Sequence, residues 1–402
     1  MENKFCIICN SSKLDSVVDL GLQPWGNGFL KKNEIKTEKK YPLEVLFCNQ
    51  CSLVQLSYFV SKEIMFSNHT YLSGVTKSLS NHFRKIVKNI SKDFNKDNKT
   101  KLILDIGSND GTFLKCAKTL GWNVLGVESS SNISKIANKN GIKTINDFFN
   151  LKLAKSINKK FDFINASGVF FHLEELHSVT QGIKYLLKEN GTFIIQFLYM
   201  SQIIKNLAFD QIYHEHLCYY NLKTLNKLLN IYDLEIFDCY LEEIHGGQMV
   251  AYVSHKNFRE KTKRFQNYII AEELQKFNTK KKYLQFSKDI KSLKQRNITF
   301  IENALNNNKL IYGMGAPVKG NTLLNYFGLN SIHIKKLLEI NNLREGMFAP
   351  GSHIPVELEN KQNVVPDVFY VLAWNFKKEI LNKNKINIKN GVEFYFPIDV
   401  TQ

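Results

Sequence analysis

The sequence of 402 residues has no run of about 18 apolar residues, which is the length that a membrane-spanning helix needs. Its first residues, Met1 to Lys4, lead straight to a cysteine motif and not to an apolar signal segment. These two absences argue against a membrane partner and predict a cytoplasmic protein. The chain is long enough for two or three domains, each with a buried core.

Acidic residues are few relative to basic ones: 37 Asp and Glu stand against 54 Lys and Arg, which gives a formal net charge of +17. Such a charge is compatible with nucleic-acid binding. The lysines are scattered among Asn and Ile, however, as at Lys281, Lys288, Lys291 and Lys294, and form no block. We therefore expect no nucleic-acid partner. One local positive patch would serve a small substrate that carries phosphate equally well.

Four of the seven cysteines form two pairs, Cys6-x-x-Cys9 and Cys48-x-x-Cys51. In a cytosolic chain, paired cysteines indicate a metal rather than disulfides. Two such pairs match zinc knuckles that complete a tetrahedral site of four thiolates, with room for a β-hairpin between them. No position on the metal stays open, so we expect a structural zinc. It would stabilise a small β-rich module at residues 1–70 whose own core is small.

Apolar strands alternate with helices after this module, which is typical of a parallel sheet. Strands are expected at 101–106, 124–127, 161–166 and 192–197, and helices at 111–120, 131–140 and 174–187. We assign residues 71–255 to this Rossmann-like core. An amphipathic helix is expected before it, at about 76–98.

Residues 256–308 contain neither glycine nor proline, so we expect long packed helices that connect two domains. A second alternation of strands and helices begins at Lys309. Its expected elements are strands at 310–312, 336–340 and 368–373, a turn at Gly313–Pro317 and a helix at 322–327. The sequence thus predicts an α/β protein with three parts. They are the zinc-binding module, the core, and a connector with a second Rossmann-like domain at 256–402.

The loop from Asp105 to Gly111 joins the first strand of the core to its helix. Gly107 and Gly111 permit a tight turn and the close approach of a ligand, and the next helix offers its N-terminus. A dinucleotide fingerprint would read G-x-G-x-x-G, and Asp105 and Asp110 would repel a pyrophosphate. A cationic sulfonium with an amino-acid tail suits the loop better. We therefore expect a methyltransferase core whose S-adenosylmethionine contacts Asp105, Gly107, Asn109, Asp110 and Gly111.

Two further acids extend this cofactor site. Glu128 follows the second strand, roughly 20 residues beyond Asp105, where nucleotide-binding α/β sheets place an acid on a ribose. Asp147 follows the next apolar stretch. There it could contact an adenine or be an acid of a solvated loop, and the sequence leaves both readings open.

The segment Tyr213–His216 (Tyr-His-Glu-His) holds two imidazoles, a carboxylate and a phenol in four consecutive positions. Its two histidines are two residues apart, which is wrong for zinc on a helix, where positions i and i+4 share a face. General acid–base chemistry fits better, because imidazole titrates near neutrality and an adjacent carboxylate can fix its tautomer. His172 and His245–Gly247 add further imidazoles.

The sequence resembles bacterial nucleotide-sugar C-methyltransferases over nearly its whole length. The shared motifs, in the same order, are the two cysteine pairs, Asp105–Gly111, Tyr213–His216, His245–Gly247 and Tyr312–Asn325 (Tyr-Gly-Met-Gly-Ala-Pro-Val-Lys-Gly-Asn-Thr-Leu-Leu-Asn). The resemblance implies a nucleotide-linked 4-keto deoxysugar as substrate. It also implies methylation of carbon 3 through an enolate, in the biosynthesis of branched sugars.

The resemblance implies catalytic roles for five residues. His216 is the expected base, with Glu215 orienting it. The expected contacts to the sugar or to the developing enolate oxygen are Tyr213, Tyr71 and His172.

The resemblance also implies that the C-terminal domain helps to hold the nucleotide sugar. The expected substrate contacts are His245, Gly246, Lys319 and Asn321. The family commonly continues His-Gly-Gly with a serine and a basic residue, whereas this sequence has Gln248 and then methionine. We expect this departure to bear on which sugar is bound. We expect the chain to act as a monomer or a weak oligomer.

Three other functions stay open. An O- or N-methyltransferase on a related sugar would need a base near a hydroxyl or amine and no neighbouring ketone. A zinc ribbon that binds RNA or DNA would need clustered basic residues, but the ribbon carries Glu34, Glu38 and Glu44 among its lysines. An NAD(P)-dependent enzyme that uses Gly313-x-Gly315 ranks below both, because Pro317 stands at the helix start and the third glycine is missing.

Overall fold

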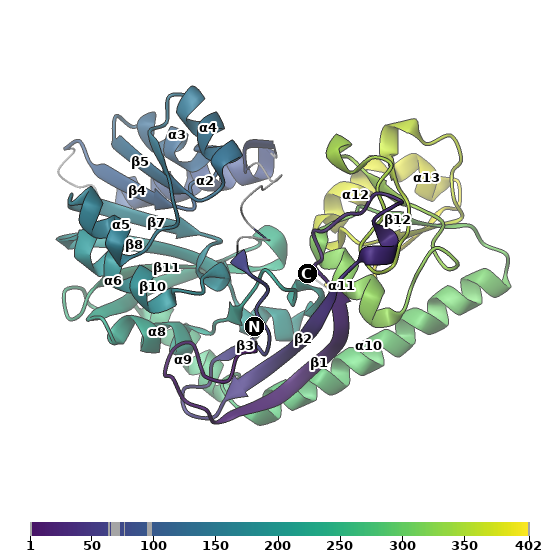
Figure 1. The fold of residues 1–402 in the computed structure, drawn as a ribbon, viewed down its shortest axis with the longest axis horizontal. Helices are drawn as coiled ribbons and strands as arrows, with labels where there is room; N and C mark the ends of the chain where they lie inside the picture. The colour runs from purple at the N-terminus through teal and green to yellow at the C-terminus, as the bar shows by residue number, and fades with distance from the viewer. Residues whose placement is uncertain (1, 63–64, 66–72, 76, 95–98, 401–402) are drawn as a thin grey trace.

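The computed structural model describes residues 2–62, 65, 73–75, 77–94 and 99–400. Three β-sheets form within these residues. One is the antiparallel sheet of the N-terminal module, one is the large sheet of the core, and one is the parallel sheet of the C-terminal domain. Figure 1 shows the core and the C-terminal domain as two lobes, with the N-terminal hairpin passing along both. The predicted α/β class with two Rossmann-like units is confirmed.

The N-terminal sheet has the strand order β1-β2-β3-β9 and is antiparallel throughout. Its strands are β1 (Leu14–Pro24), β2 (Lys40–Cys48), β3 (Val54–Leu56) and β9 (Cys218–Tyr219), and the 3-10 helix η1 (Ile35–Thr37) lies between β1 and β2. The hairpin predicted between the cysteine pairs is therefore present as β1 and β2. Strand β9 comes from the core, however, so residues 1–70 do not complete their own sheet.

The core sheet has the order β10-β11-β8-β7-β4-β5-β6, with β8, β7, β4, β5 and β6 parallel and β10 and β11 antiparallel. Its strands are β4 (Leu102–Ile106), β5 (Asn123–Glu128), β6 (Thr144–Asn146), β7 (Phe161–Ser167), β8 (Leu187–Leu198), β10 (Leu234–Glu242) and β11 (Gln248–His255). The four predicted strands are present, while β6 and the antiparallel pair were not predicted. Strand β8 begins at Leu187, where the sequence predicted the end of a helix.

Helices cover both faces of this sheet. They are α2 (Lys77–Phe94), α3 (Thr112–Lys118), α4 (Ser131–Lys139), α5 (Leu151–Ile157), α6 (Leu176–Leu186), α7 (Met200–Lys205) and α8 (Leu222–Asn230), with the short 3-10 helices η2 (Ser73–Val75), η3 (Phe170–His172), η4 (Phe209–Gln211) and η5 (Ile244–Gly246). Helix α2 buries apolar residues at helical spacing, among them Phe83, Ile86 and Ile90. Phe83 meets Phe113 of α3 edge to face at 5.6 Å between ring centroids. This packing fixes α3 and the loop that precedes it.

The connector and the C-terminal domain follow. Helices α9 (Lys263–Leu274) and α10 (Lys280–Asn306) lead to a parallel sheet of order β14-β13-β12-β15-β16. Its elements are β12 (Ile311–Met314), α11 (Val318–Phe327), β13 (Leu337–Glu339), η6 (Asn342–Arg344), β14 (Val356–Leu358), η7 (Glu359–Lys361), β15 (Val368–Val371), η8 (Trp374–Phe376), α12 (Lys377–Lys383), α13 (Lys385–Lys389) and β16 (Glu393–Tyr395). Helix α11 begins before the predicted residue 322, because Pro317 is its N-cap and does not interrupt it.

In each parallel sheet the strand order reverses beside the first strand. Strand β4 lies between β5 and β7, and β12 lies between β13 and β15. Ligands of such sheets bind at this switch point, beyond the carboxyl ends of the strands. The structure therefore has two places of this kind, one in the core and one in the C-terminal domain.

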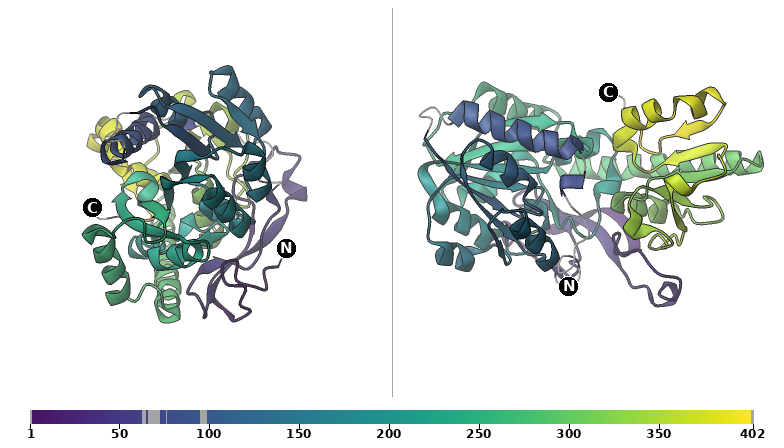
Figure 2. Two further views of the ribbon diagram at one scale, coloured as in Figure 1. Left: turned by 90° about the vertical axis from the view of Figure 1, so that its left-hand side faces the viewer. Right: turned by 90° about the horizontal axis from the view of Figure 1, so that it is seen from above.

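The N-terminal hairpin ties the two lobes together, as Figures 1 and 2 show. Near its base, Lys280 of α10 forms an ion pair of 2.8 Å with Asp15. At its far end, Asn321 Nδ2 donates to the carbonyl of Gly26 at 2.7 Å, and Glu38 accepts from His353 Nε2 at 2.9 Å. No helix within the described residues is both long and apolar enough to cross a membrane.

Candidate functional site

The four paired cysteines come together at the base of the hairpin. The sulfur atoms of Cys6, Cys9, Cys48 and Cys51 all lie within 4.8 Å of one another. The pairs Cys6–Cys51 and Cys9–Cys48 are 3.4 and 3.5 Å apart. Thiolates around a tetrahedral zinc with bonds of about 2.3 Å lie roughly 3.8 Å apart, so the cluster has the dimensions of a zinc site. Four sulfur ligands leave no open position, which makes the site structural.

The zinc cluster is linked to the core through Gln55 of β3. Gln55 Oε1 accepts from the backbone N–H of Ile7, and its Nε2 donates to the carbonyl of Phe5, both at 2.9 Å. Gln55 also pairs with Cys218 of β9. Strand β9 begins two positions after His216, so the sheet that carries the metal continues into the segment with the clustered histidines.

Loss of the metal should therefore unfold the N-terminal sheet. We expect the purified chain to hold about one zinc ion, and Cys48→Ser to lose it together with several degrees of Tm, because three thiolates cannot close the site. Cys116→Ser, which changes a cysteine outside the cluster, is the matched control and should keep both. Metal analysis gives the zinc content, and thermal unfolding gives the Tm, of the unchanged protein and the two variants. A Cys48→Ser protein with a full complement of zinc would contradict the assignment.

The loop after β4 lies at the switch point of the core sheet. Asp105 is buried, and its Oδ1 accepts from Asn165 Nδ2 at 2.7 Å. Glu128, at the end of β5, accepts from the backbone N–H of Asn109 and of Ser130 at 2.9 and 2.8 Å. Glu128 and the Asp105–Gly111 loop, which were predicted to bind the same cofactor, are thus in direct contact.

The loop follows a path that requires its glycines. Gly107 has φ +69° and Gly111 has φ +79°. A Cβ on Gly107 would lie 2.6 Å from Cγ2 of Val169, and one on Gly111 would lie 3.0 Å from Ile142. The backbone therefore approaches its surroundings more closely than any side chain would allow.

The two remaining acids have different surroundings. Asp110 accepts from Thr112 Oγ1 at 2.7 Å through one oxygen and from the N–H of Gly74 at 2.9 Å through the other. It therefore holds η2 and the start of α3 in place. Asp147 is exposed, directly after β6, and accepts from the N–H of Phe148 at 2.8 Å.

Burial sets the charge of this loop. It raises the pKa of Asp105 to about 8, which the hydrogen bond from Asn165 opposes and the charge of Glu128 reinforces. Burial also raises the pKa of Glu128, against the effect of its backbone donors. Two neighbouring buried carboxyl groups favour a cationic ligand, because its charge would stabilise their ionised forms. These two carboxyl groups, together with a glycine-containing loop that allows close approach of a ligand, fit S-adenosylmethionine, whose sulfonium and ammonium groups are both positive.

The raised pKa of Asp105 predicts a pH-dependent affinity for S-adenosylmethionine. A cation binds the ionised carboxylate, so affinity should rise with pH up to about 8, where the empty site becomes ionised, and then level off. Asp105→Asn should weaken binding about tenfold at high pH and flatten this dependence. Calorimetric titration at several pH values measures it. Asp289→Asn, on α10, is the control and should bind S-adenosylmethionine as the unchanged protein does. If the affinity of Asp105→Asn depended on pH as steeply as that of the unchanged protein, the proposed role of Asp105 would be ruled out.

His216 lies in the turn after η4, and its hydrogen bond defines its tautomer. Its Nδ1 is 2.7 Å from the carbonyl oxygen of Gln211. A carbonyl can only accept, so Nδ1 carries the proton and Nε2 keeps its lone pair. The ring of Tyr213 lies over His216 at 3.8 Å between centroids. Burial and the neighbouring His172 lower the pKa of His216 well below its usual 6.5, so the imidazole is neutral at pH 7.

The prediction that Glu215 orients His216 is not supported, because the hydrogen bond of Glu215 leads elsewhere. Its Oε1 accepts from Trp25 Nε1 of the hairpin at 2.8 Å. The orientation of His216 comes from the backbone of Gln211 instead. Burial raises the pKa of Glu215 to about 7, which the indole N–H and the charge of Arg344 oppose.

Other predicted residues join this cluster. The ring of His172 lies 5.1 Å from that of His216, and its Nδ1 is 2.5 Å from the carbonyl oxygen of Glu215. Tyr71 lies outside the described residues. His214 turns away toward the hairpin, where its Nε2 is 3.3 Å from the carbonyl of Pro42, and burial lowers its pKa to about 4.

The residues predicted to contact substrate lie at the junction with the C-terminal domain. Asn321 is buried against Gly26 of the hairpin, and Lys319 Nζ lies 3.6 Å from the ring centroid of Trp374. Gly246 packs so closely that a Cβ would be 2.7 Å from Trp374. His245 precedes it in η5. Lys319 and Asn321 therefore have contacts within the protein.

Sequence reasoning missed the acid that meets Trp374. Asp210 Oδ2 accepts from Trp374 Nε1 at 2.6 Å, and Asp210 is fully buried. Burial raises its pKa to about 6, which the charge of Lys319 and the indole N–H oppose. Asp210 and Gln211 stand just before the Tyr213–His216 motif, and that proximity was the available signal.

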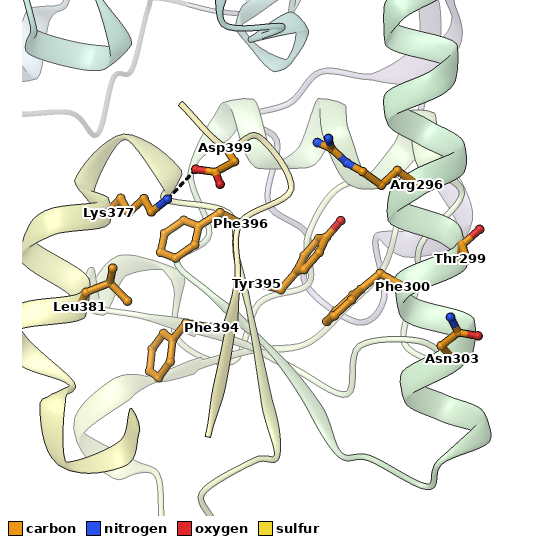
Figure 3. A pocket seen from close by; sticks show the side chains of 10 residues that line it. All are labelled: Arg296, Thr299, Phe300, Asn303, Lys377, Leu381, Phe394, Tyr395, Phe396 and Asp399. Carbon is orange, nitrogen blue, oxygen red and sulfur yellow. Dashed lines mark hydrogen bonds and ion pairs between the residues drawn. The ribbon is translucent and has the colours of Figure 1, made fainter. Parts of the chain in front are cut away.

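A separate hollow of about 590 Å³ lies in the C-terminal domain, between α10, β16 and α12 (Figure 3). Tyr395 stacks on Phe300 at 3.6 Å between ring centroids, and Lys377 pairs with Asp399 at 2.5 Å. Of the residues predicted to bind cofactor or substrate, none that the structure describes lines it. The hollow is therefore distinct from the cluster around His216.

Comparison with known proteins gives matches along the chain. Family models match residues 6–66 as a zinc binding domain, 79–238 as a methyltransferase domain and 243–399 as a C-methyltransferase C-terminal domain. The C-methyltransferase NovU of Streptomyces niveus is 27% identical over 399 residues, 98% of this chain and 95% of that protein.

Two solved structures are similar to part of the chain. Magnesium protoporphyrin IX methyltransferase ChlM of Synechocystis PCC 6803, with bound SAH, is 14% identical. The match covers 45% of this chain and 88% of that one, with a TM-score of 0.36. The plantazolicin methyltransferase BpumL in complex with SAH is 18% identical over 44% of this chain and 82% of its own, with a TM-score of 0.36.

Proposed function

We propose that this chain, a member of the S-adenosylmethionine-dependent C-methyltransferases with a zinc-binding, a methyltransferase and a C-methyltransferase C-terminal domain, methylates carbon 3 of a nucleotide-linked 4-keto deoxysugar. The observation that carries the proposal is the neutral His216, whose Nε2 is left to accept a proton. We place the enzyme in the cytoplasm, in branched-sugar biosynthesis, as a monomer or weak oligomer without a nucleic-acid or membrane partner.

The proposed reaction begins at the carbon next to the ketone. The carbonyl at carbon 4 acidifies the C–H bond at carbon 3, and Nε2 of His216 takes that proton. The electron pair moves into an enolate, whose oxygen Tyr213, His172 and Tyr71 stabilise. Bound S-adenosylmethionine supplies an electrophilic methyl group. Carbon 3 bonds to this methyl as its carbon–sulfur bond breaks and leaves S-adenosylhomocysteine.

The low pKa of His216 has two effects on this chemistry. It keeps the imidazole unprotonated at pH 7, so the base is always available. It also makes the imidazole a weak proton acceptor, so stabilisation of the enolate oxygen must contribute much of the driving force. Glu215, with a pKa of about 7 in the same turn, is the competing proton acceptor.

The remaining residues have binding roles in the proposal. The S-adenosylmethionine site consists of Asp105, Gly107, Asn109, Asp110, Gly111 and Glu128, with Asp147 near the adenine. Glu128 accepts hydrogen bonds from the ribose, and Asp110 acts by holding the loop. The residues proposed to contact the nucleotide sugar are His245, Gly246, Lys319 and Asn321.

The test is methyl transfer from carbon-13-labelled S-adenosylmethionine to 4-keto-6-deoxy sugars linked to dTDP, GDP or CDP. We expect a product whose labelled methyl is bonded to carbon 3, as carbon–proton correlation spectra show. His216→Gln should lower kcat about 100- to 10,000-fold, the usual contribution of a general base, with little change in affinity for the methyl donor.

Glu215→Gln is the matched comparison. It should keep most of the activity if His216 is the base and lose it if Glu215 is. A labelled methyl on oxygen or nitrogen would favour the O- or N-methyltransferase instead. Transfer to none of these sugars would refute the substrate class.

A further inference from the structure

The switch point of the C-terminal sheet is filled by the protein itself. Trp374 follows β15 and Lys319 follows β12, and the ammonium of Lys319 lies 3.6 Å from the centre of the indole. The loops after these two strands also touch, because a Cβ on Gly315 would lie 2.9 Å from that of Ala373. A Rossmann-like sheet usually holds its ligand in this crevice.

The acid at the end of β13 is also engaged within the protein. Glu339 stands where such sheets place the acid that binds a ribose. Its Oε2 accepts from the N–H of Ala316 and from Arg344 Nη1, both at 3.2 Å. Its other oxygen accepts from the backbone N–H of Ile340 at 2.7 Å. Glu339 therefore ties the loop after β12 and Arg344 to the end of β13.

The switch point faces η4 and the Tyr213–His216 turn that follows it, which together are called the catalytic segment. The indole N–H of Trp374 donates to Asp210 of η4 at 2.6 Å, across the junction between the domains. Burial raises the pKa of Asp210 and so favours its protonated form. The indole N–H and the charge of Lys319 both favour its ionised form, which binds the indole more strongly. Gly246 leaves room for the tryptophan because it has no side chain.

A short path leads from this contact to the proposed base. Asp210 and Gln211 are consecutive residues of η4, and the carbonyl of Gln211 accepts from His216 Nδ1. A shift of η4 would therefore move the oxygen that fixes the tautomer of His216. The hydrogen bond from Trp374 thus acts on the imidazole of His216 through Asp210 and Gln211.

We propose that the C-terminal domain uses its Rossmann-type switch point to position the catalytic segment, with Trp374 and Asp210 as positioning residues that fix η4 and, through Gln211, the tautomer and direction of His216. The role of His216 as base rests on the proposed function. The positioning of its imidazole does not, so it can be tested without any substrate.

The test is the tautomer of His216 in the full chain, read from nitrogen-15 spectra of protein with labelled histidine. The His216 signals are those that disappear in His216→Gln. The unchanged protein should show the proton on Nδ1. Trp374→Phe removes the N–H but keeps a ring beneath Lys319, and it should give a mixture of tautomers.

The matched control is Trp122→Phe. Trp122 is a buried tryptophan of the core, stacked on Phe163 at 5.0 Å between ring centroids, and its replacement should leave the His216 signals unchanged. In the methyl-transfer assay, Trp374→Phe should lower kcat at least tenfold with little change in the KM for S-adenosylmethionine. An unchanged tautomer in Trp374→Phe would overturn the proposal, whatever the assay gives.

A second pair of variants keeps the test decisive if Trp374→Phe fails to fold. Asp210→Asn retains an oxygen that can accept from the indole and should keep the Nδ1 tautomer. Asp210→Leu has no acceptor and should lose it. Identical His216 spectra in these two variants would overturn the proposal. Failure of the proposed function would appear separately, as a normal tautomer in a protein that transfers no methyl group to the sugars.

Discussion

The hydrogen bond between His216 Nδ1 and the carbonyl of Gln211 is the contact on which the proposed chemistry depends. It assigns the proton to one nitrogen of a buried imidazole and leaves the other nitrogen basic. Its geometry depends on η4 and the turn that follows. Both ends of this segment are held from outside the core, by Trp374 at Asp210 and by Trp25 at Glu215. Each flanking domain thus contributes one indole N–H to a buried carboxyl group.

The zinc module belongs to the same arrangement, although its metal is not at the reaction centre. The cluster holds one end of the β1–β2 hairpin, while Trp25 lies at the other end and reaches Glu215. Strand β9 closes the sheet of the module directly after His216. The metal cluster is therefore linked to the Tyr213–His216 segment by two routes, each of which includes hydrogen bonds: the pairing of β3 with β9, and the contact of Trp25 with Glu215.

Features that depend on local sequence were predictable, and contacts between distant segments were not. The cysteine pairs and the Asp105–Gly111 loop have spacings whose geometry follows from a few consecutive residues. The contacts Trp25–Glu215 and Trp374–Asp210 join residues 190 and 164 positions apart, which only the packing of domains brings together. The error over Glu215 has the same origin. Its neighbour in sequence is His216, but Glu215 accepts from Trp25 of the hairpin, whereas Nδ1 of His216 faces the carbonyl of Gln211.

Hydrogen exchange at carbon 3 is the most direct test of the account. The nucleotide 4-keto sugar would be incubated in deuterated water with the protein and S-adenosylhomocysteine, so that no methyl group can be transferred. If His216 removes the proton to give an enolate, the recovered sugar should carry one deuterium at carbon 3, and His216→Gln should abolish its enzymatic incorporation. A sugar that the unchanged protein returns without deuterium at carbon 3, from a mixture that does methylate it when S-adenosylmethionine is supplied, would contradict the enolate mechanism.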